Sequence, residues 1–322
     1  MIDLMGLEPQ QISKNLKGKF VLIYGQEGCG KTTLASKFNK TLMCGFERGT
    51  NALHNVYVQP IKAWSEWKTV VSQLCRKPEL KEKYETICID TVDEAWRLCV
   101  RYICANNGIE DLSEIPYGKA YDLATNEFSN TLRNLAYSGY GIVYITHAVE
   151  KTYEDDDGDE YVKIQPSLPA RPFAVVNKMV DIITYIREIY VGEEKKPERY
   201  MFFRGDNRRF LVKSRYKYIE PRAKLSYEDF VDVVYKAIEK EIEEKGGVAT
   251  EKEDPYLTRN FDELMEEARI LWNLAVSKDQ TEEVLKILEE EFKQPIKFSE
   301  ILSTQVDELF NSIEKIKELI QK

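Results

Sequence analysis

The stretch "FVLIYGQEGCGKTT" at residues 20–33 decides the fold of this chain. It begins with five apolar or aromatic residues, which is the pattern of a strand buried on both faces. Residues 25–32 fit G-x-x-x-x-G-K-[ST], and the residues from Lys31 to Phe38 favour a helix. A strand, a glycine-rich loop and a helix in this order are the setting of a phosphate-binding loop.

Each part of this loop has an expected task. Glycines let backbone N–H groups turn toward a phosphate, and the N-terminus of the following helix adds a positive dipole. We expect Lys31 to reach the β- and γ-phosphates of ATP, Thr32 to bind Mg²⁺ and Thr33 to touch the α-phosphate. The predicted nucleotide-binding residues are Gly25, Gln26, Glu27, Gly28, Cys29, Gly30, Lys31, Thr32 and Thr33.

The rest of the first two thirds of the chain favours an α/β fold. Further apolar, β-rich runs lie at 40–44, 86–90 and 142–146. Helical patterns separate them, so we predict a mainly parallel sheet with crossover helices. Residues 149–164 predict a hairpin around an acidic turn, and residues 199–215 predict a second hairpin with its turn at 205–207.

Composition changes near the end of the core. Residues 244–258 are highly charged and contain Gly-Gly, which indicates a linker. We therefore predict an ATPase core over 1–243 and an all-α domain over 259–322. An apolar stripe in that domain fits either one face of a small bundle or an oligomer seam. Its members are Leu302, Val306, Leu309, Ile313, Ile316 and Ile320.

Charge and cysteine usage exclude several classes of protein. The net charge is -9, so any nucleic-acid surface must be local rather than general. The six cysteines form no CxxC pair, which favours reduced core residues over disulfides or a zinc site. There is no run of 18 apolar residues and no signal peptide pattern, so we expect a soluble, cytoplasmic protein without a membrane partner.

Acidic and polar residues at the ends of apolar strands predict the hydrolytic groups. Asp90 ends "ETICID", where a Walker B aspartate would hold Mg²⁺. Thr91 follows it, so the acid that positions water must come from elsewhere. Glu47, just past the second strand, is the candidate, and Glu94, one helical turn after Asp90, is the alternative. His147 ends a further strand, and its position resembles that of the γ-phosphate sensor in RecA-like proteins, so we expect it to act as a hydrogen-bonding sensor.

An ordered set of segments resembles a known family. The set comprises the glycine loop, "FERGTNAL", "ICIDTVDEAWRLC", "YGKAYDLATNEF", "IVYITH", "PSLPARPFAVVNKMVDIITYI" and "RGDNRRFLVKSR". Together they resemble the phage nucleotide-binding proteins of the Sak type, which are RecA-like single-strand annealing ATPases among the P-loop and AAA proteins. The resemblance covers roughly residues 10–230 and does not clearly cover 250–322.

The resemblance implies an ATP-dependent phage protein that binds single-stranded DNA and assists recombination in the bacterial host. It also implies a homo-oligomer, either a ring or a filament. Lys213 and Arg215 in "LVKSR" lie two apart on one strand, and therefore on one face. They look like the residues that reach the γ-phosphate of a neighbouring subunit in RecA-like hexamers.

A basic segment is the expected DNA surface. Residues 204–224 contain eight basic residues against two acidic ones, with Tyr216 and Tyr218 between them. Charge neutralisation with base stacking holds single strands without sequence preference. The predicted contacts are Arg204, Arg208, Arg209 and Lys217. By analogy with RecA-like proteins, DNA loops are expected at 105–118 and 150–172, although the acidic tip of the second would repel phosphate.

The sequence is compatible with other functions. A hexameric helicase-type motor would use the same site, and a non-enzymatic scaffold would use ATP only to order its assembly. A small-molecule kinase is disfavoured because no lid arginines or acceptor pocket are recognisable. The acidic C-terminal helices are expected to bind a partner, such as a single-strand-binding protein, or to cap the assembly.

Overall fold

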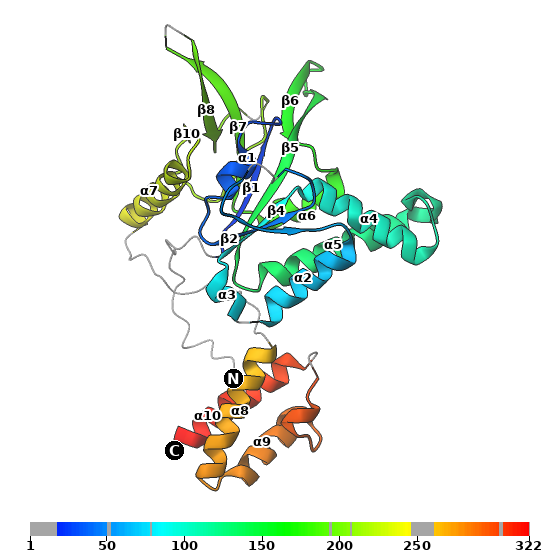
Figure 1. Ribbon diagram of the computed structural model, residues 1–322, viewed down its shortest axis with the longest axis vertical. Coiled ribbons are helices and arrows are strands. Elements are labelled where there is room, and N and C mark those ends of the chain that lie inside the picture. Colours follow the sequence, from blue (N-terminus) through cyan, green and yellow to red (C-terminus); the bar gives the residue numbers. More distant parts are fainter. Residues whose placement is uncertain are drawn as a thin grey trace.

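The apolar run before the glycine loop forms β1 (Phe20–Gly25), a central strand of a ten-stranded sheet in the computed structural model (Figure 1). The structure describes residues 18–49, 53–77, 79–192, 195–206, 208–245, 261–302 and 305–321. β1 lies between β5 (Gly141–Glu154) and β7 (Ile182–Val191) and is parallel to both. Val21 and Ile23 face one side of the sheet, while Leu22 and Tyr24 face the other, so both faces are buried.

The sheet is parallel at its centre and on one side. Beyond β5, the next strands in the sheet are β4 (Thr86–Asp90), β2 (Thr41–Gly45) and β3 (Tyr57–Pro60), and each is parallel to its neighbour. On the other side, β8 (Lys196–Phe202) and β10 (Arg222–Lys224) add antiparallel strands beyond β7. The predicted α/β fold with a mainly parallel sheet and hairpin additions is confirmed.

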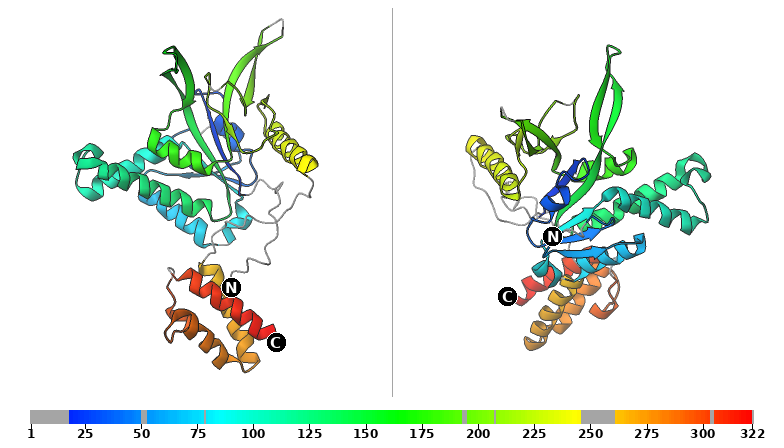
Figure 2. Two further views of the ribbon diagram at one scale, coloured as in Figure 1. Left: turned by 180° about the vertical axis from the view of Figure 1, so that it is seen from behind. Right: turned by 45° about the horizontal axis from the view of Figure 1, so that its top comes forward.

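Helices cover both faces of this sheet (Figure 2). α2 (Trp64–Arg76), α4 (Val92–Asn107) and α5 (Lys119–Ala136) pack on the face of Leu22 and Tyr24. α1 (Lys31–Ala35) and α7 (Tyr227–Lys245) pack on the face of Val21 and Ile23. The smaller helices are α3 (Glu79–Lys83), α6 (Ala170–Met179), η1 (Leu112–Glu114) and η2 (Pro116–Gly118). All six cysteines are free and five are buried, as the sequence predicts.

One predicted hairpin is confirmed and the other is wrong. β5 pairs antiparallel with β6 (Glu160–Pro166) to form the expected arm. β8 instead forms a hairpin with β7. In the second half of the predicted hairpin, β9 (Lys213–Ser214) pairs with β7 and not with β8. The cause is Phe210, whose ring packs into the core against Tyr185 and Phe202, so the chain turns inward there.

The C-terminal helices α8 (Phe261–Ser277), α9 (Thr281–Phe292) and α10 (Val306–Gln321), with η3 (Phe298–Glu300), share their own apolar core. Leu309, Ile313 and Ile316 of the predicted stripe are fully buried in it, as expected for the face of a bundle. Residues 244 and 245 still belong to α7, and the rest of the predicted linker lies outside the described residues. Among the described helices, none combines the length and apolarity that crossing a bilayer requires.

Candidate nucleotide site

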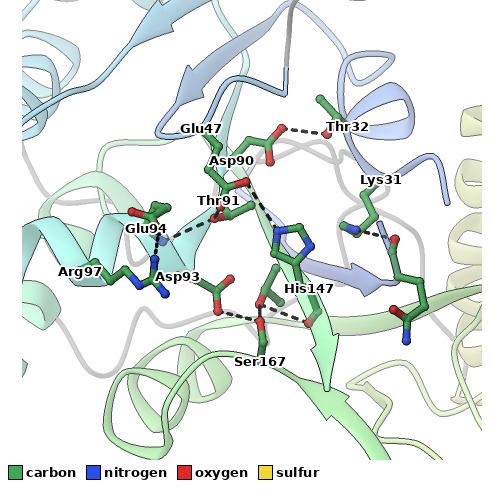
Figure 3. Close-up of polar contacts among 12 residues, drawn as sticks. Lys31, Thr32, Glu47, Asp90, Thr91, Asp93, Glu94, Arg97, His147 and Ser167 are labelled. Atoms are coloured by element: carbon green, nitrogen blue, oxygen red, sulfur yellow. Dashed lines mark hydrogen bonds and ion pairs between the residues drawn. The ribbon is translucent and has the colours of Figure 1, made fainter. Parts of the chain in front are cut away.

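β1, β2 and β4 end at one edge of the parallel sheet, and the residues at this edge form the predicted site. β5 crosses the same edge at His147 and continues to Glu154, so the prediction that His147 ends its strand is wrong. In the register of the sheet, Gly25 of β1 lies beside His147 of β5, and Asp90 of β4 lies beside Gly45 of β2. Glu47 follows β2 by two residues. Because parallel strands present their carboxyl ends together, residues far apart in the sequence meet here (Figure 3).

The glycine loop leaves no room for side chains at its two ends. A Cβ at Gly25 would lie 2.5 Å from the carbonyl oxygen of Ile186 and 2.7 Å from Sγ of Cys29. Gly30 has φ of +101°, a left-handed conformation that favours glycine, and it precedes the first residue of α1. Gln26, Glu27 and Gly28 form the exposed tip of the loop. The loop is therefore shaped as a backbone cradle.

Lys31 lies inside this cradle. Its side chain is buried, and Nζ donates hydrogen bonds to the carbonyl oxygens of Gly25 at 2.9 Å and Gln26 at 2.8 Å. These contacts hold the ammonium group at the loop, where a phosphate would compete for it. Thr33 is exposed on α1, next to the loop.

The predicted magnesium ligands meet. Oγ1 of Thr32 donates to Oδ2 of Asp90 at 2.9 Å, so the two oxygen ligands face each other across the loop. Burial raises the pKa of Asp90, the hydrogen bond from Thr32 opposes this shift, and the charge of Glu47 adds to it. Within the described residues, no group of three acidic, histidine or cysteine side chains forms a metal cage. One carboxylate and one hydroxyl fit Mg²⁺ that is held partly by phosphate oxygens.

The structure places Glu47, rather than Glu94, beside Asp90. Oγ1 of Thr91 donates to Oε1 of Glu47 at 2.7 Å, and Nε2 of His147 lies 3.6 Å from Oε2 of Glu47. The backbone N–H of Phe46 donates to the carbonyl oxygen of Asp90 at 2.7 Å and fixes the turn that carries Glu47. Glu94 instead forms an ion pair with Arg97 on the surface of α4. Thr91 thus helps to hold the glutamate that sequence reasoning placed on another strand.

Two further polar residues, Asp93 and Ser167, which the sequence analysis missed, support β5 around Thr146 and His147. Oγ of Ser167 donates to Oδ1 of Asp93 at 2.8 Å and lies 3.1 Å from Oγ1 of Thr146. The backbone N–H of Ser167 donates to the carbonyl oxygen of His147 at 2.9 Å. In the described part of the chain, Nδ1 of His147 and Oδ2 of Asp93 are buried without a partner, and such groups normally have one. In the sequence, the one feature that could have pointed to Asp93 is its position three residues after Asp90.

Lys213 and Arg215 lie toward the amino end of the parallel strands, away from the glycine loop. Lys213 pairs with Ile183 of β7, and Ile183 lies beside Leu22 of β1. Leu22 precedes Gly25 by three residues. Those three residues span about 10 Å of strand. Nζ of Lys213 donates to the carbonyl oxygen of Asn177, while Arg215 donates to that of Lys178 at 2.9 Å and pairs with Asp181 at 3.1 Å. Burial, followed by the charge of Arg215, lowers the pKa of Lys213.

The four predicted DNA contacts fall into two groups. Arg204 donates to the backbone carbonyls of Tyr216, Lys217 and Ile219, so it supports the fold of that loop. Lys217 contacts Tyr218 and lies 3.7 Å from Glu244.

Arg208 and Arg209 lie beside the β5–β6 arm, away from the first group. Arg208 pairs with Asp155 at 2.7 Å and lies over the ring of Tyr161, and the side chain of Arg209 is largely exposed. Residues 105–118, an expected DNA loop, form the corner between α4 and α5 that projects to the right in Figure 1.

The sequence analysis did not single out Arg199, a basic residue that lies beside the glycine loop. It lies on β8, and Nη1 is 3.7 Å from where a Cβ at Gly30 would stand. Arginine on an edge strand has no motif of its own, so only the sheet topology shows this placement.

Comparison with known proteins identifies a family and a relative of similar length. A family model described as an AAA domain matches residues 17–216, from β1 through β9. The SPbeta prophage-derived uncharacterized protein YorG of Bacillus subtilis (strain 168) is 27% identical over 330 residues, which cover 99% of each chain. The crystal structure of flagellar accessory protein FlaH from Methanocaldococcus jannaschii is 12% identical, covers 58% of this chain and 77% of its own, and gives a TM-score of 0.32.

Proposed function

The chain belongs to the AAA domain family, and from this premise we propose that it is a Mg²⁺-dependent phage ATPase that binds single-stranded DNA and assists recombination by annealing strands. The similarity to a prophage-derived protein over 99% of both chains supports a phage origin. The family supports nucleotide binding, and the ordered set of motifs supports the DNA part of the proposal.

One observation carries the ATPase part. Lys31, Thr32, Asp90, Glu47 and His147 come from four different strands or the segments that follow them, yet they surround one backbone cradle. A glycine turn that served only the fold would require neither a buried lysine nor two acidic residues beside it. The same arrangement of cation, carboxylate and water-positioning acid performs phosphoryl transfer in other P-loop proteins.

Each of these residues has a defined task in hydrolysis. The loop amides and Lys31 bind and orient the phosphates, while Thr32 and Asp90 would hold Mg²⁺ through their oxygens. When bound, Mg²⁺ neutralises charge that develops on the phosphates. Glu47 accepts a hydrogen bond from Thr91, which leaves its other oxygen, the one facing His147, to orient or deprotonate a water. His147 would act as a hydrogen-bonding sensor of the γ-phosphate.

The position of Lys213 and Arg215 supports action between subunits. Both residues lie at the amino end of the parallel strands, whereas the glycine loop of the same chain lies at the carboxyl end. A lysine or arginine side chain cannot span about 10 Å of strand and the loop beyond it. If these residues serve a γ-phosphate, it belongs to a neighbouring copy, as in a ring or a filament.

The deciding experiment measures ATP hydrolysis by the full chain with Mg²⁺, with and without single-stranded DNA, beside its sedimentation. We expect DNA to increase turnover and complementary strands to anneal faster with protein and ATP. Lys31→Ala should lose nucleotide binding and hydrolysis. Normal turnover by Lys31→Ala would overturn the site.

Two other results would replace the proposal. Nucleotide-driven strand separation without annealing would indicate a helicase-type motor. Negligible turnover, with nucleotide still changing the size of the assembly, would indicate a scaffold. Sedimentation and a fluorescent duplex measure these outcomes on the same samples.

A further inference from the structure

The edge of the sheet beyond β7 brings a positive charge to the glycine loop. β8 and β10 pair antiparallel, and the backbone N–H of Leu225, just after β10, donates to the carbonyl oxygen of Arg199 at 2.9 Å. A Cβ at Gly30 would lie 2.9 Å from Cδ2 of Leu225 and 3.7 Å from Nη1 of Arg199. These two side chains therefore form an outer wall against the last glycine of the cradle.

Arg199 is available for a ligand. Its side chain is 48% exposed, and its ion pair with Glu188 is long, with Nε 3.7 Å from Oε2. An exposed pair at this distance contributes little to stability. Arginine also has donors that fit phosphate oxygens two at a time. The guanidinium can therefore exchange a weak surface pair for a stronger charge-assisted contact.

The charge of Arg199 acts on the loop itself. Burial raises the pKa of the Cys29 thiol, and the nearby charges of Lys31 and Arg199 oppose that shift. Cys29 lies in the cradle between the exposed tip and Gly30. Arg199 and Lys31 thus approach the same loop from different elements, one from β8 and one from α1.

We propose that Arg199 binds the diphosphate part of the nucleotide held by its own chain, an inference that rests on the proposed nucleotide site. Lys31 is the residue placed to serve the β- and γ-phosphates, and Asp90 with Glu47 lies on the β4–β2 side of the loop. Arg199 approaches from the β8–β10 side at Gly30, away from those acidic residues. It therefore contributes equally to ATP and ADP binding and does not sense the terminal phosphate.

The test measures the dissociation constants of ATP, ADP and adenosine for the full chain. Arg199→Ala should raise the dissociation constants of ATP and ADP by the same factor, about tenfold, as expected when one charge-assisted hydrogen bond is removed. Adenosine binding should change little. Arg199→Gln keeps most of the side chain's packing and should give the same result, which separates charge from folding. Arg222→Ala on neighbouring β10, whose guanidinium lies over Tyr200, is the matched control.

The outcomes separate this inference from the proposed function. Loss of ATP affinity with ADP affinity unchanged would contradict it, because Arg199 would then serve the γ-phosphate. Unchanged affinities in both Arg199 variants, with tight binding by the wild type, would overturn the inference alone. Absence of nucleotide binding by the wild type would overturn both.

Discussion

Nε2 of His147 lies 3.6 Å from Oε2 of Glu47, although 99 residues separate them in the chain. The contact joins the middle of β5 to the turn after β2, and β4 with Asp90 lies between these two strands. Oε1 of the same glutamate accepts a hydrogen bond from Thr91. The carboxylate is therefore held from two sides beside the predicted magnesium ligand, and this geometry supports the proposal that Glu47 positions water.

Glu47→Gln should lower the turnover number about 100-fold or more while ATP affinity stays within a few-fold, since general-base groups contribute roughly that much. Steady-state hydrolysis and equilibrium nucleotide binding measure the two quantities. Glu94→Gln is the matched control, because Glu94 pairs with Arg97 away from the site. A large loss in Glu94→Gln with normal turnover in Glu47→Gln would reverse the assignment.

Mixing two inactive variants should restore ATP hydrolysis if Lys213 and Arg215 act on a neighbouring subunit. One variant carries Lys31→Ala, and the other carries Lys213→Ala with Arg215→Ala. In a mixed oligomer, an intact loop from the second variant meets intact basic residues from the first. We expect the mixture to exceed the summed rates of its parts several-fold.

Folding is the control for this mixing experiment. Arg215 pairs with the partly buried Asp181, so the loss of Arg215 removes a partner of that carboxylate. The double variant must therefore retain nucleotide affinity and a cooperative thermal transition. A properly folded mixture without recovered activity would contradict action between subunits, as would a double variant that hydrolyses ATP like the wild type.

Arg208→Ala with Arg209→Ala should weaken single-stranded DNA binding and reduce its salt dependence. The slope of log K against log salt should fall by about 1.4, at roughly 0.7 for each phosphate that the protein no longer neutralises. Fluorescence anisotropy at several salt concentrations gives this slope. Arg269→Ala with Lys286→Ala, exposed residues of α8 and α9, is the control. An unchanged slope in the first variant would move the DNA site elsewhere.

Alanine at two glycines of the loop should have different effects on stability. At Gly28, φ is +71° and no atom lies within 4 Å of an added Cβ, so only backbone strain of about 1 kcal/mol is expected. At Gly25, the Cβ would strike the backbone oxygen of Ile186, so β1 and β7 must separate locally. We expect a loss of about 3 kcal/mol there, measured by urea unfolding. Equal losses would show that the loop relaxes.

Much of the fold follows from local pattern. The run at 20–24 is followed by glycines and a helical pattern, and the arm at 149–164 has a turn in its middle, so both were predictable. The partner of β8 was not. "RGDNRRF" resembles a turn followed by a strand, but burial of Phe210 against Tyr185 and Phe202 outweighs that pattern. Burying a large aromatic ring contributes more free energy than extending a short strand pair.

The sequence by itself determined the phosphate cradle, the α/β class and the aspartate at the end of β4, because each is written in neighbouring residues with a defined spacing. Only the tertiary structure decided which glutamate meets that aspartate, on which edge Lys213 and Arg215 lie, and that Arg199 reaches Gly30. These relationships depend on strand order and register. Both arise from packing between distant segments, which no local spacing contains.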